Sequence, residues 1–140
     1  MASKVIDFEE LGEFSKALLH NAKVTRPKET KKFVNQQGYA LRRKARELSK
    51  QRVRKKSGAY HKGWKKGKLY RYKGNKDSLA VRVYNANPYA HVIENGRRYH
   101  KDGAEYFKKG AHVLEDATKD FTPEYYAALD KFLDELVKSI

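Results

Sequence analysis

The second half of the chain contains a stretch in which three kinds of local structure follow one another, Tyr84-Asn85-Ala86-Asn87-Pro88-Tyr89-Ala90-His91-Val92-Ile93-Glu94-Asn95-Gly96-Arg97-Arg98. Residues 85–88 predict the end of a strand, because Asn and Pro favour turns. Residues 89–94 predict a short helical turn, and Gly96 is expected to close it as a C-terminal cap. Residues 97–104 predict a loop or a short strand.

The segment before this stretch predicts strands. Trp64, residues 68–72 and residues 79–84 are rich in aromatic and β-branched side chains. Between the last two, residues 73–77 include Gly74 and Asn75, which accept positive φ and therefore predict a hairpin loop.

Helices are predicted on both sides of these strands. Residues 7–23 carry apolar side chains at helical spacing, and Pro27 is expected to interrupt that helix. Residues 28–53 predict a longer second helix. Residues 107–119 predict a third helix, and Thr122-Pro123 predicts a new helix start, with Thr122 as the cap.

We therefore expect one α+β domain over residues 1–140, with a small, mostly antiparallel sheet of three to four strands. The sheet is expected to pack against a long, bent N-terminal helix and a C-terminal helix. The predicted parts are a helical part over about 7–53, a sheet part over about 60–100 and a C-terminal helical part over about 105–138.

The charge of the chain is unevenly distributed. The net charge is +15, and residues 42–73 hold fifteen Lys or Arg against the single acid Glu47. Residues 120–140 hold five acids against Lys131 and Lys138. This separation predicts an acidic or polyanionic partner for the middle of the chain, and it permits head-to-tail association between copies.

Several classes of protein are disfavoured. The chain has no cysteine, which excludes disulfides and thiolate metal sites. Its five histidines have no metal-ligand spacing, and no nucleophile or phosphate-loop motif is present, so neither an enzyme nor a cofactor is predicted. No run of residues is apolar enough to predict a membrane span.

Four motifs in order resemble the tail-completion (tail-component) proteins of long-tailed bacteriophages. They are Ser57-Gly58-Ala59-Tyr60-His61-Lys62-Gly63-Trp64; a strand into Asn85 with Tyr89-Ala90; Val92-x-Glu94-x-Gly96; and Gly110-Ala111-His112-Val113-Leu114. Tyr60-His61 stands where relatives usually have Leu-Arg, and Arg97-Arg98 where many have His-Arg. The resemblance covers about residues 40–137.

The resemblance implies a non-catalytic virion protein of the neck or tail, found in the host cytoplasm during assembly. It implies a ring of copies, by analogy a hexamer. The implied partners are a head connector or head-completion protein and a tail tube or tail terminator protein, with DNA passing through the channel.

Two groups of residues are candidate contacts. Subunit or partner contacts are predicted for Tyr89, Glu94, Arg97, Arg98 and Trp64; the alternative is that these residues merely build a stable corner. Contacts with DNA or an acidic partner are predicted for Arg52, Arg54, Lys55 and Lys56, with a solvated surface as the alternative. Glu94 is expected to accept backbone N–H bonds or to pair with Arg97 or Arg98.

A rival from another class remains open. The charge alone also fits a basic nucleic-acid-binding protein of the ribosome- or nucleoid-associated type. The aromatics among the lysines of residues 64–72 fit base stacking, but alternate aromatics in a strand are more often core. A toxin-like nuclease would need clustered acids and histidines, which the sequence lacks.

Overall fold

The computed structural model describes residues 13, 16–55, 57–71 and 79–139. Its elements in chain order are η1 (Asn21–Thr25), α2 (Pro27–Arg52), α3 (Ala59–Lys62), β1 (Trp64–Lys66), β2 (Tyr70–Arg71), β3 (Leu79–Ala80), β4 (Val83–Asn85), α4 (Ala90–Asn95), β5 (Gly96–Lys101), β6 (Ala104–Lys109) and α5 (Val113–Lys138). The predicted α+β class is confirmed. The predicted hairpin loop at 73–77 lies outside the described residues.

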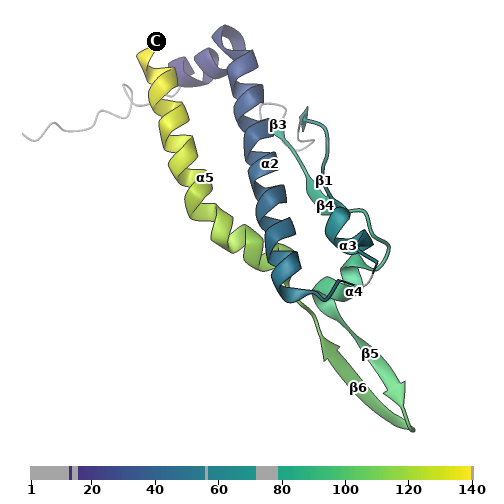
Figure 1. Ribbon diagram of the computed structural model, residues 1–140. Helices are drawn as coiled ribbons and strands as arrows, with labels where there is room; N and C mark the ends of the chain where they lie inside the picture. The colour runs from purple at the N-terminus through teal and green to yellow at the C-terminus, as the bar shows by residue number, and fades with distance from the viewer. Residues whose placement is uncertain (1–12, 14–15, 56, 72–78, 140) are drawn as a thin grey trace, which may run out of the picture.

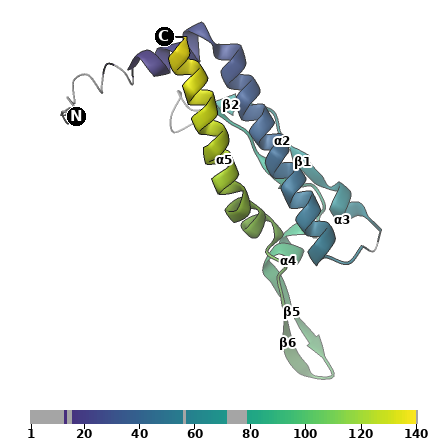
Figure 2. The same cartoon turned by 60° about the vertical axis from the view of Figure 1, so that its left-hand side comes forward.

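Helix α2 forms the centre of the molecule. Helix α5 packs along one side of α2, and β1 and β4 lie on its other side (Figures 1 and 2). The described strands form three antiparallel pairs, β1–β4, β2–β3 and β5–β6, rather than one sheet of three or four strands. The ladder breaks at Val81 and Arg82, so that β3 and β4 pair with different partners.

The N-terminal helix is bent, as predicted. Residues 16–20 are α-helical, and the π-helical turn η1 leads into Arg26, whose φ of −130° and ψ of 52° end the helix before Pro27 begins α2. The side chain of Asn21 donates hydrogen bonds to the Leu136 carbonyl at 2.8 Å and to Ser139 Oγ at 2.7 Å. The bend is thereby tied to the C-terminal end of α5. The remainder of the predicted helix over 7–23 lies outside the described residues.

Close contacts hold α2 between its neighbours. A Cβ on Gly38 would lie 2.8 Å from both Lys66 Cδ and Val81 Cγ1, so a larger residue there would force these two side chains to shift. On the opposite side, Phe33 stacks on Phe132 of α5 with ring centroids 4.5 Å apart. Gly38 has a low intrinsic preference for a helix, but its lack of a side chain lets the neighbouring residues pack against α2.

The prediction of a helix over 107–119 is wrong at its start. Residues 104–109 form β6, and the helix begins only at Val113. The predicted new start at Thr122-Pro123 is also wrong, because α5 is continuous through Pro123. Thr122 donates its hydroxyl hydrogen bond back to the Thr118 carbonyl at 2.8 Å instead of capping a helix. Buried residues at steps of four, Val113, Ala117 and Phe121, favour continuation across the proline.

The hydrophobic core lies where α2, α3, β1 and the first turns of α5 meet. Its buried members are Ala45, Tyr60, Trp64, Val113 and Ala117. Beside this core, α4 leads directly into β5, and the β5–β6 hairpin projects away from the helices (Figure 1). The core thus fixes the base of a hairpin that projects away from the body, and no described atom beyond the neighbouring residues lies within 4 Å of where a Cβ on Gly103 would be.

The projecting hairpin turns through two residues. Asp102 and Gly103 have φ values of 53° and 79° and connect the paired residues Lys101 and Ala104. Two positive φ angles are typical of the type I′ turn, for which Asp-Gly is a favoured sequence. The predicted loop or short strand at 97–104 is therefore the first strand and the turn of a longer ribbon.

Candidate functional site

The first two motifs of the sequence lie against each other. Trp64 pairs with Asn85 across β1 and β4. Asn85 Nδ2 donates to the Tyr60 carbonyl at 2.8 Å, and its Oδ1 accepts from the Asn87 N–H at 2.9 Å. A Cβ on Gly63 would lie 2.4 Å from Asn85 Oδ1. The glycine before Trp64 therefore leaves the space that the side chain of Asn85, the last residue of β4, occupies.

Tyr60 and His61, which replace the Leu-Arg of the resemblance, are structural. Tyr60 is 7% exposed and packs edge-on against Trp64 at 5.8 Å between centroids. Burial raises the pKa of the Tyr60 hydroxyl to about 12, and the nearby Glu94 charge acts in the same direction. His61 Nε2 donates to the carbonyls of Ser49 and Val53 at 3.1 and 3.0 Å. His61 thus satisfies carbonyls at the C-terminal end of α2.

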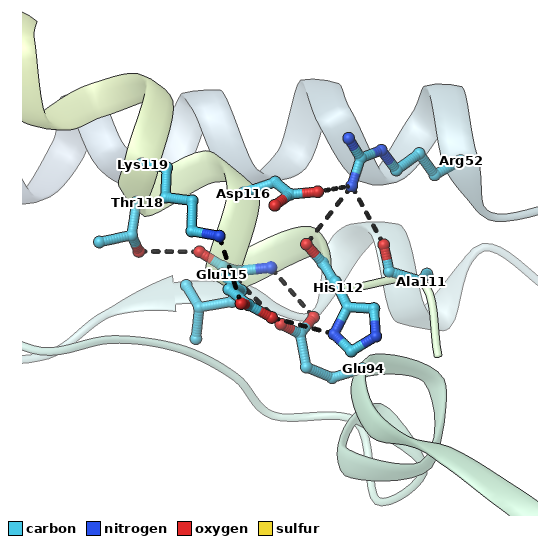
Figure 3. A network of polar contacts seen from close by, with 9 residues as sticks. Arg52, Glu94, Ala111, His112, Glu115, Asp116, Thr118 and Lys119 are labelled. Atoms are coloured by element: carbon cyan, nitrogen blue, oxygen red, sulfur yellow. Dashed lines mark hydrogen bonds and ion pairs between the residues drawn. The ribbon is translucent and has the colours of Figure 1, made fainter. Parts of the chain in front are cut away.

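Glu94 joins the third motif to the fourth (Figure 3). Its Oε1 accepts from the Leu114 N–H and its Oε2 from the Glu115 N–H, both at 3.0 Å. These N–H groups belong to the first turn of α5, where no intrahelical partner exists and a negative charge is favourable. Of the two predicted roles for Glu94, the backbone one is confirmed. Among the described residues, no ion pair joins it to Arg97 or Arg98.

Two glycines permit the close approach of these motifs. Gly96 has φ 86° and ψ 177°, so its φ is positive as predicted but its conformation is extended rather than left-handed helical. A Cβ there would lie 2.3 Å from the Lys108 carbonyl oxygen. A Cβ on Gly110 would lie 2.1 Å from the Glu94 carbonyl oxygen. Both strands of the hairpin therefore leave the body through positions that only glycine fits.

Arg52 is engaged within the protein, which argues against its predicted role in binding DNA. Its guanidinium forms an ion pair with Asp116 and donates to the carbonyls of Ala111 and His112 at 3.1 and 3.4 Å (Figure 3). The hydrogen bond from Arg52 holds the pKa of Asp116 below its ordinary value of 3.8. Asp116 lies 64 residues from Arg52 in sequence. A local sequence pattern therefore does not predict this ion pair.

The other candidates differ in exposure. Trp64 is 3% exposed in the core, so its prediction as a contact residue is corrected to the core role that alternate aromatics favoured. Tyr89 is 70% exposed, and Arg97 and Arg98 are exposed on β5. Arg98 lies 3.8 Å from Glu105 of β6.

Arg54 and Lys55 are exposed in the segment after α2, as expected of a contact loop. Lys56 lies outside the described residues. The structure therefore leaves Arg54 and Lys55 as the described members of this basic loop that are available to a partner.

The structure brings members of both candidate groups to one depression at the base of the hairpin. Arg52, Arg54, Tyr89 and Arg97 all line it, and its volume is about 700 Å³. Two further cations, Lys108 and Lys109, come from β6, and no carboxylate of the described residues lines the depression. Apolar and aromatic side chains also line it, namely Val53, Tyr60, Tyr89, Val92 and Ile93. A depression of this kind fits an acidic surface that also carries apolar side chains.

The hairpin itself is the feature that the sequence prediction missed. All residues of β5 and β6 except Gly96 are exposed. The signal was the dipeptide Asp102-Gly103, which favours a two-residue hairpin turn. The charged residues around this dipeptide lack the apolar alternation of a half-buried strand, so the pattern does not predict two long strands.

Within the described residues, no three His, Asp or Glu side chains lie close enough together to hold a metal ion. No described helix is both long enough and apolar enough to cross a membrane. Comparisons with protein-family models, with curated proteins and with solved structures gave no match to this chain.

Proposed function

We propose that this protein is a structural component of a bacteriophage neck, which completes the tail or joins it to the head as one copy of a ring. The observation that carries the proposal is the cationic depression with apolar lining residues at the base of the projecting hairpin. A surface of this kind suits docking of a neighbouring protein, because apolar contacts supply affinity and charge supplies orientation.

The way the four motifs interlock supports the same proposal. Asn85 ties the first motif to the second, and Glu94 ties the third to the fourth. Each tie holds one side of the depression or one strand of the hairpin in place. The residues that carry the resemblance to tail-completion proteins therefore build and orient the proposed docking surface, and chemistry is not required of them.

A DNA-binding function is the second candidate, and one observation favours it. Arg46, Lys50, Lys55 and Lys62 line a second, smaller depression together with Gly58 and His61. No carboxylate from the described part of the chain lines this second depression, so its cations would attract phosphates, with an affinity that falls steeply with salt. We place this function second because it leaves the acidic α5 and the apolar lining of the first depression without a role.

Deletion of the gene from the genome that encodes it tests the proposal. We expect DNA-filled heads and separate tails in electron micrographs, with joined particles restored when the wild-type gene is supplied in trans. A gene that encodes the variant Arg54→Glu/Arg97→Glu, supplied in trans, should fail to restore joining. The control Glu105→Gln, a substitution on the exposed hairpin outside the depression, should restore it. Infectious, fully joined particles from the deletion would refute the proposal.

A gel shift separates the two candidates. The neck function predicts weak binding of the purified protein to a DNA duplex at physiological salt. Tight, stoichiometric binding under those conditions, lost on Lys50→Glu/Lys62→Glu, would favour the nucleic-acid-binding alternative.

A further inference from the structure

One face of the hairpin combines an aromatic pair with facing cations. In an antiparallel ladder, directly opposed residues point to the same face, so Arg97 and Lys108 lie side by side, as do Tyr99 and Tyr106. The two tyrosine rings stack at 5.5 Å between centroids and remain 39% and 47% exposed. Like charges directly opposed across strands are destabilising. This face therefore gains stability from a partner that brings carboxylates and an apolar surface.

Helix α5 carries a complementary stripe. Tyr126, Asp130, Asp134 and Val137 follow one another at steps of four, four and three, which places them on one face of the helix. All four are exposed, Tyr126 to 58% and Val137 to 42%. Among the described residues, neither aspartate has an ion-pair partner. Like charges four residues apart weaken a helix, so this stripe in turn gains stability from cations.

The spacing of the two charged pairs is matched. Residues four apart on a helix have Cβ atoms about 5–6 Å apart. Directly opposed residues in an antiparallel ladder have Cβ atoms about 4.5–5.5 Å apart. The Arg97–Lys108 pair can therefore face the Asp130–Asp134 pair when the helix crosses the two strands, and Tyr126 then lies at the edge of the face that Tyr99 and Tyr106 form.

The two surfaces cannot meet within one chain. The hairpin projects beyond the end of the molecule where α5 begins, whereas α5 runs from that end to the other (Figures 1 and 2). Tyr126 lies thirteen residues past Val113, about 20 Å along the helix axis and away from the hairpin. A contact between them must join two copies, and it uses two different patches on each.

We propose that the hairpin face of one copy, formed by Arg97, Tyr99, Tyr106 and Lys108, packs on the α5 stripe of a second copy. This contact is heterologous, so it generates a ring when the rotation closes and a filament when it does not. The inference rests on the proposed function. It identifies α5 of a second copy as one partner of the depression, because Arg97 and Lys108 also line that depression.

DNA is a less suitable occupant of the hairpin face. Asp102 lies at the tip of the hairpin, and its exposed carboxylate would repel phosphates. DNA also leaves the acidic stripe of α5 unmatched. Contact between copies accounts for both surfaces.

Two charge reversals test the contact. The hairpin variant is Arg97→Glu/Lys108→Glu, and the helix variant is Asp130→Lys/Asp134→Lys. Light scattering should show wild-type mass rising with concentration, and each variant alone should lose association by at least about 100-fold. An equimolar mixture of the two variants should recover wild-type association, because each reversed surface then meets its reversed complement on the other chain.

The control is Arg98→Glu, which reverses a charge on the opposite face of the hairpin at a residue that does not line the depression. It should associate as the wild type does, with far-ultraviolet circular dichroism verifying that all variants fold. Because the chain has no cysteine, a chain with Tyr106→Cys mixed with a chain with Tyr126→Cys should give one disulfide-linked species under oxidising conditions.

Three outcomes overturn the inference. A wild-type chain that stays monomeric at its highest soluble concentration and gives no cross-link removes the contact. Association that both reversals leave unchanged places the contact elsewhere, while the proposed neck function stands, because gene deletion tests that function separately. A monomer that binds a DNA duplex through Arg97 and Lys108 assigns the hairpin face to phosphates instead.

Discussion

Replacing Glu94 tests whether its carboxylate holds the base of the hairpin to α5. Glu94→Ala removes two hydrogen bonds of 3.0 Å to the Leu114 and Glu115 N–H groups. Loss of an N-cap costs about 1 kcal/mol, and loss of a negative charge at a helix N-terminus costs up to about 1 kcal/mol more. We expect the free energy of unfolding to fall by about 2 kcal/mol. Glu94→Gln, which keeps one acceptor oxygen, should lose about 1 kcal/mol.

Urea unfolding followed by circular dichroism measures both variants, and the melting temperature of Glu94→Ala should fall by about 8 °C. The control is Glu105→Ala, because Glu105 is an exposed carboxylate on the same hairpin, 3.8 Å from Arg98. Its change should stay within about 0.5 kcal/mol. A Glu94→Ala protein no less stable than Glu105→Ala would refute the argument that Glu94 acts as a cap.

Three further predictions concern backbone fit and ionisation. Gly96→Ala should destabilise the protein by about 3 kcal/mol or more in urea unfolding, because its Cβ would meet the Lys108 carbonyl oxygen at 2.3 Å in a conformation that only glycine favours; wild-type stability would contradict this. Because Arg52 lowers the pKa of Asp116, this pair stabilises the folded state above the ordinary pKa of 3.8, and the contribution is lost as pH falls through the lowered pKa. Asp116→Asn should flatten that part of the pH–stability curve, and an unchanged curve would refute the assignment. Burial raises the pKa of Tyr60 from 10.0 to about 12, so its contribution to stability is present below pH 10 and is lost as pH rises towards 12. An ultraviolet titration should show a late ionisation step that Tyr60→Phe removes, and persistence of that step in the variant would contradict the prediction.

Local signals predicted several elements correctly. Pro27 marks the start of α2, and the stretch 89–96 forms a short helix that ends at a glycine of positive φ. These features depend on the backbone preferences of single residues, which act in any context. The interruption of the N-terminal helix and the extent of α2 follow from the same kind of signal.

Local signals failed where a distant contact outweighed them. Thr122-Pro123 has the chemistry of a helix start, yet the buried stripe through Phe121 keeps α5 continuous. The charged residues of β5 and β6 lack an apolar alternation because the hairpin they form is exposed on both faces. A pattern based on burial cannot detect a strand that the monomer does not bury.

The candidate site was predicted in part. The sequence identified Tyr89, Arg97 and Arg54 as candidate contacts, and the structure places all three at one depression. Arg52 carried the same expectation, but the ion pair with Asp116 engages it within the fold. Which cation is available and which is paired depends on residues far apart in sequence, so composition alone could not distinguish them.

The sequence by itself determined the α+β class, the bend before α2, the short helix that Gly96 ends and the separation of positive from negative charge. Only the tertiary structure decided that the strands form separate pairs, that Glu94 caps α5 and that a charged hairpin projects from the body. The physical reason is range: backbone preferences and net charge act through neighbouring residues, whereas caps, ion pairs and ladder partners require packing that brings distant segments together.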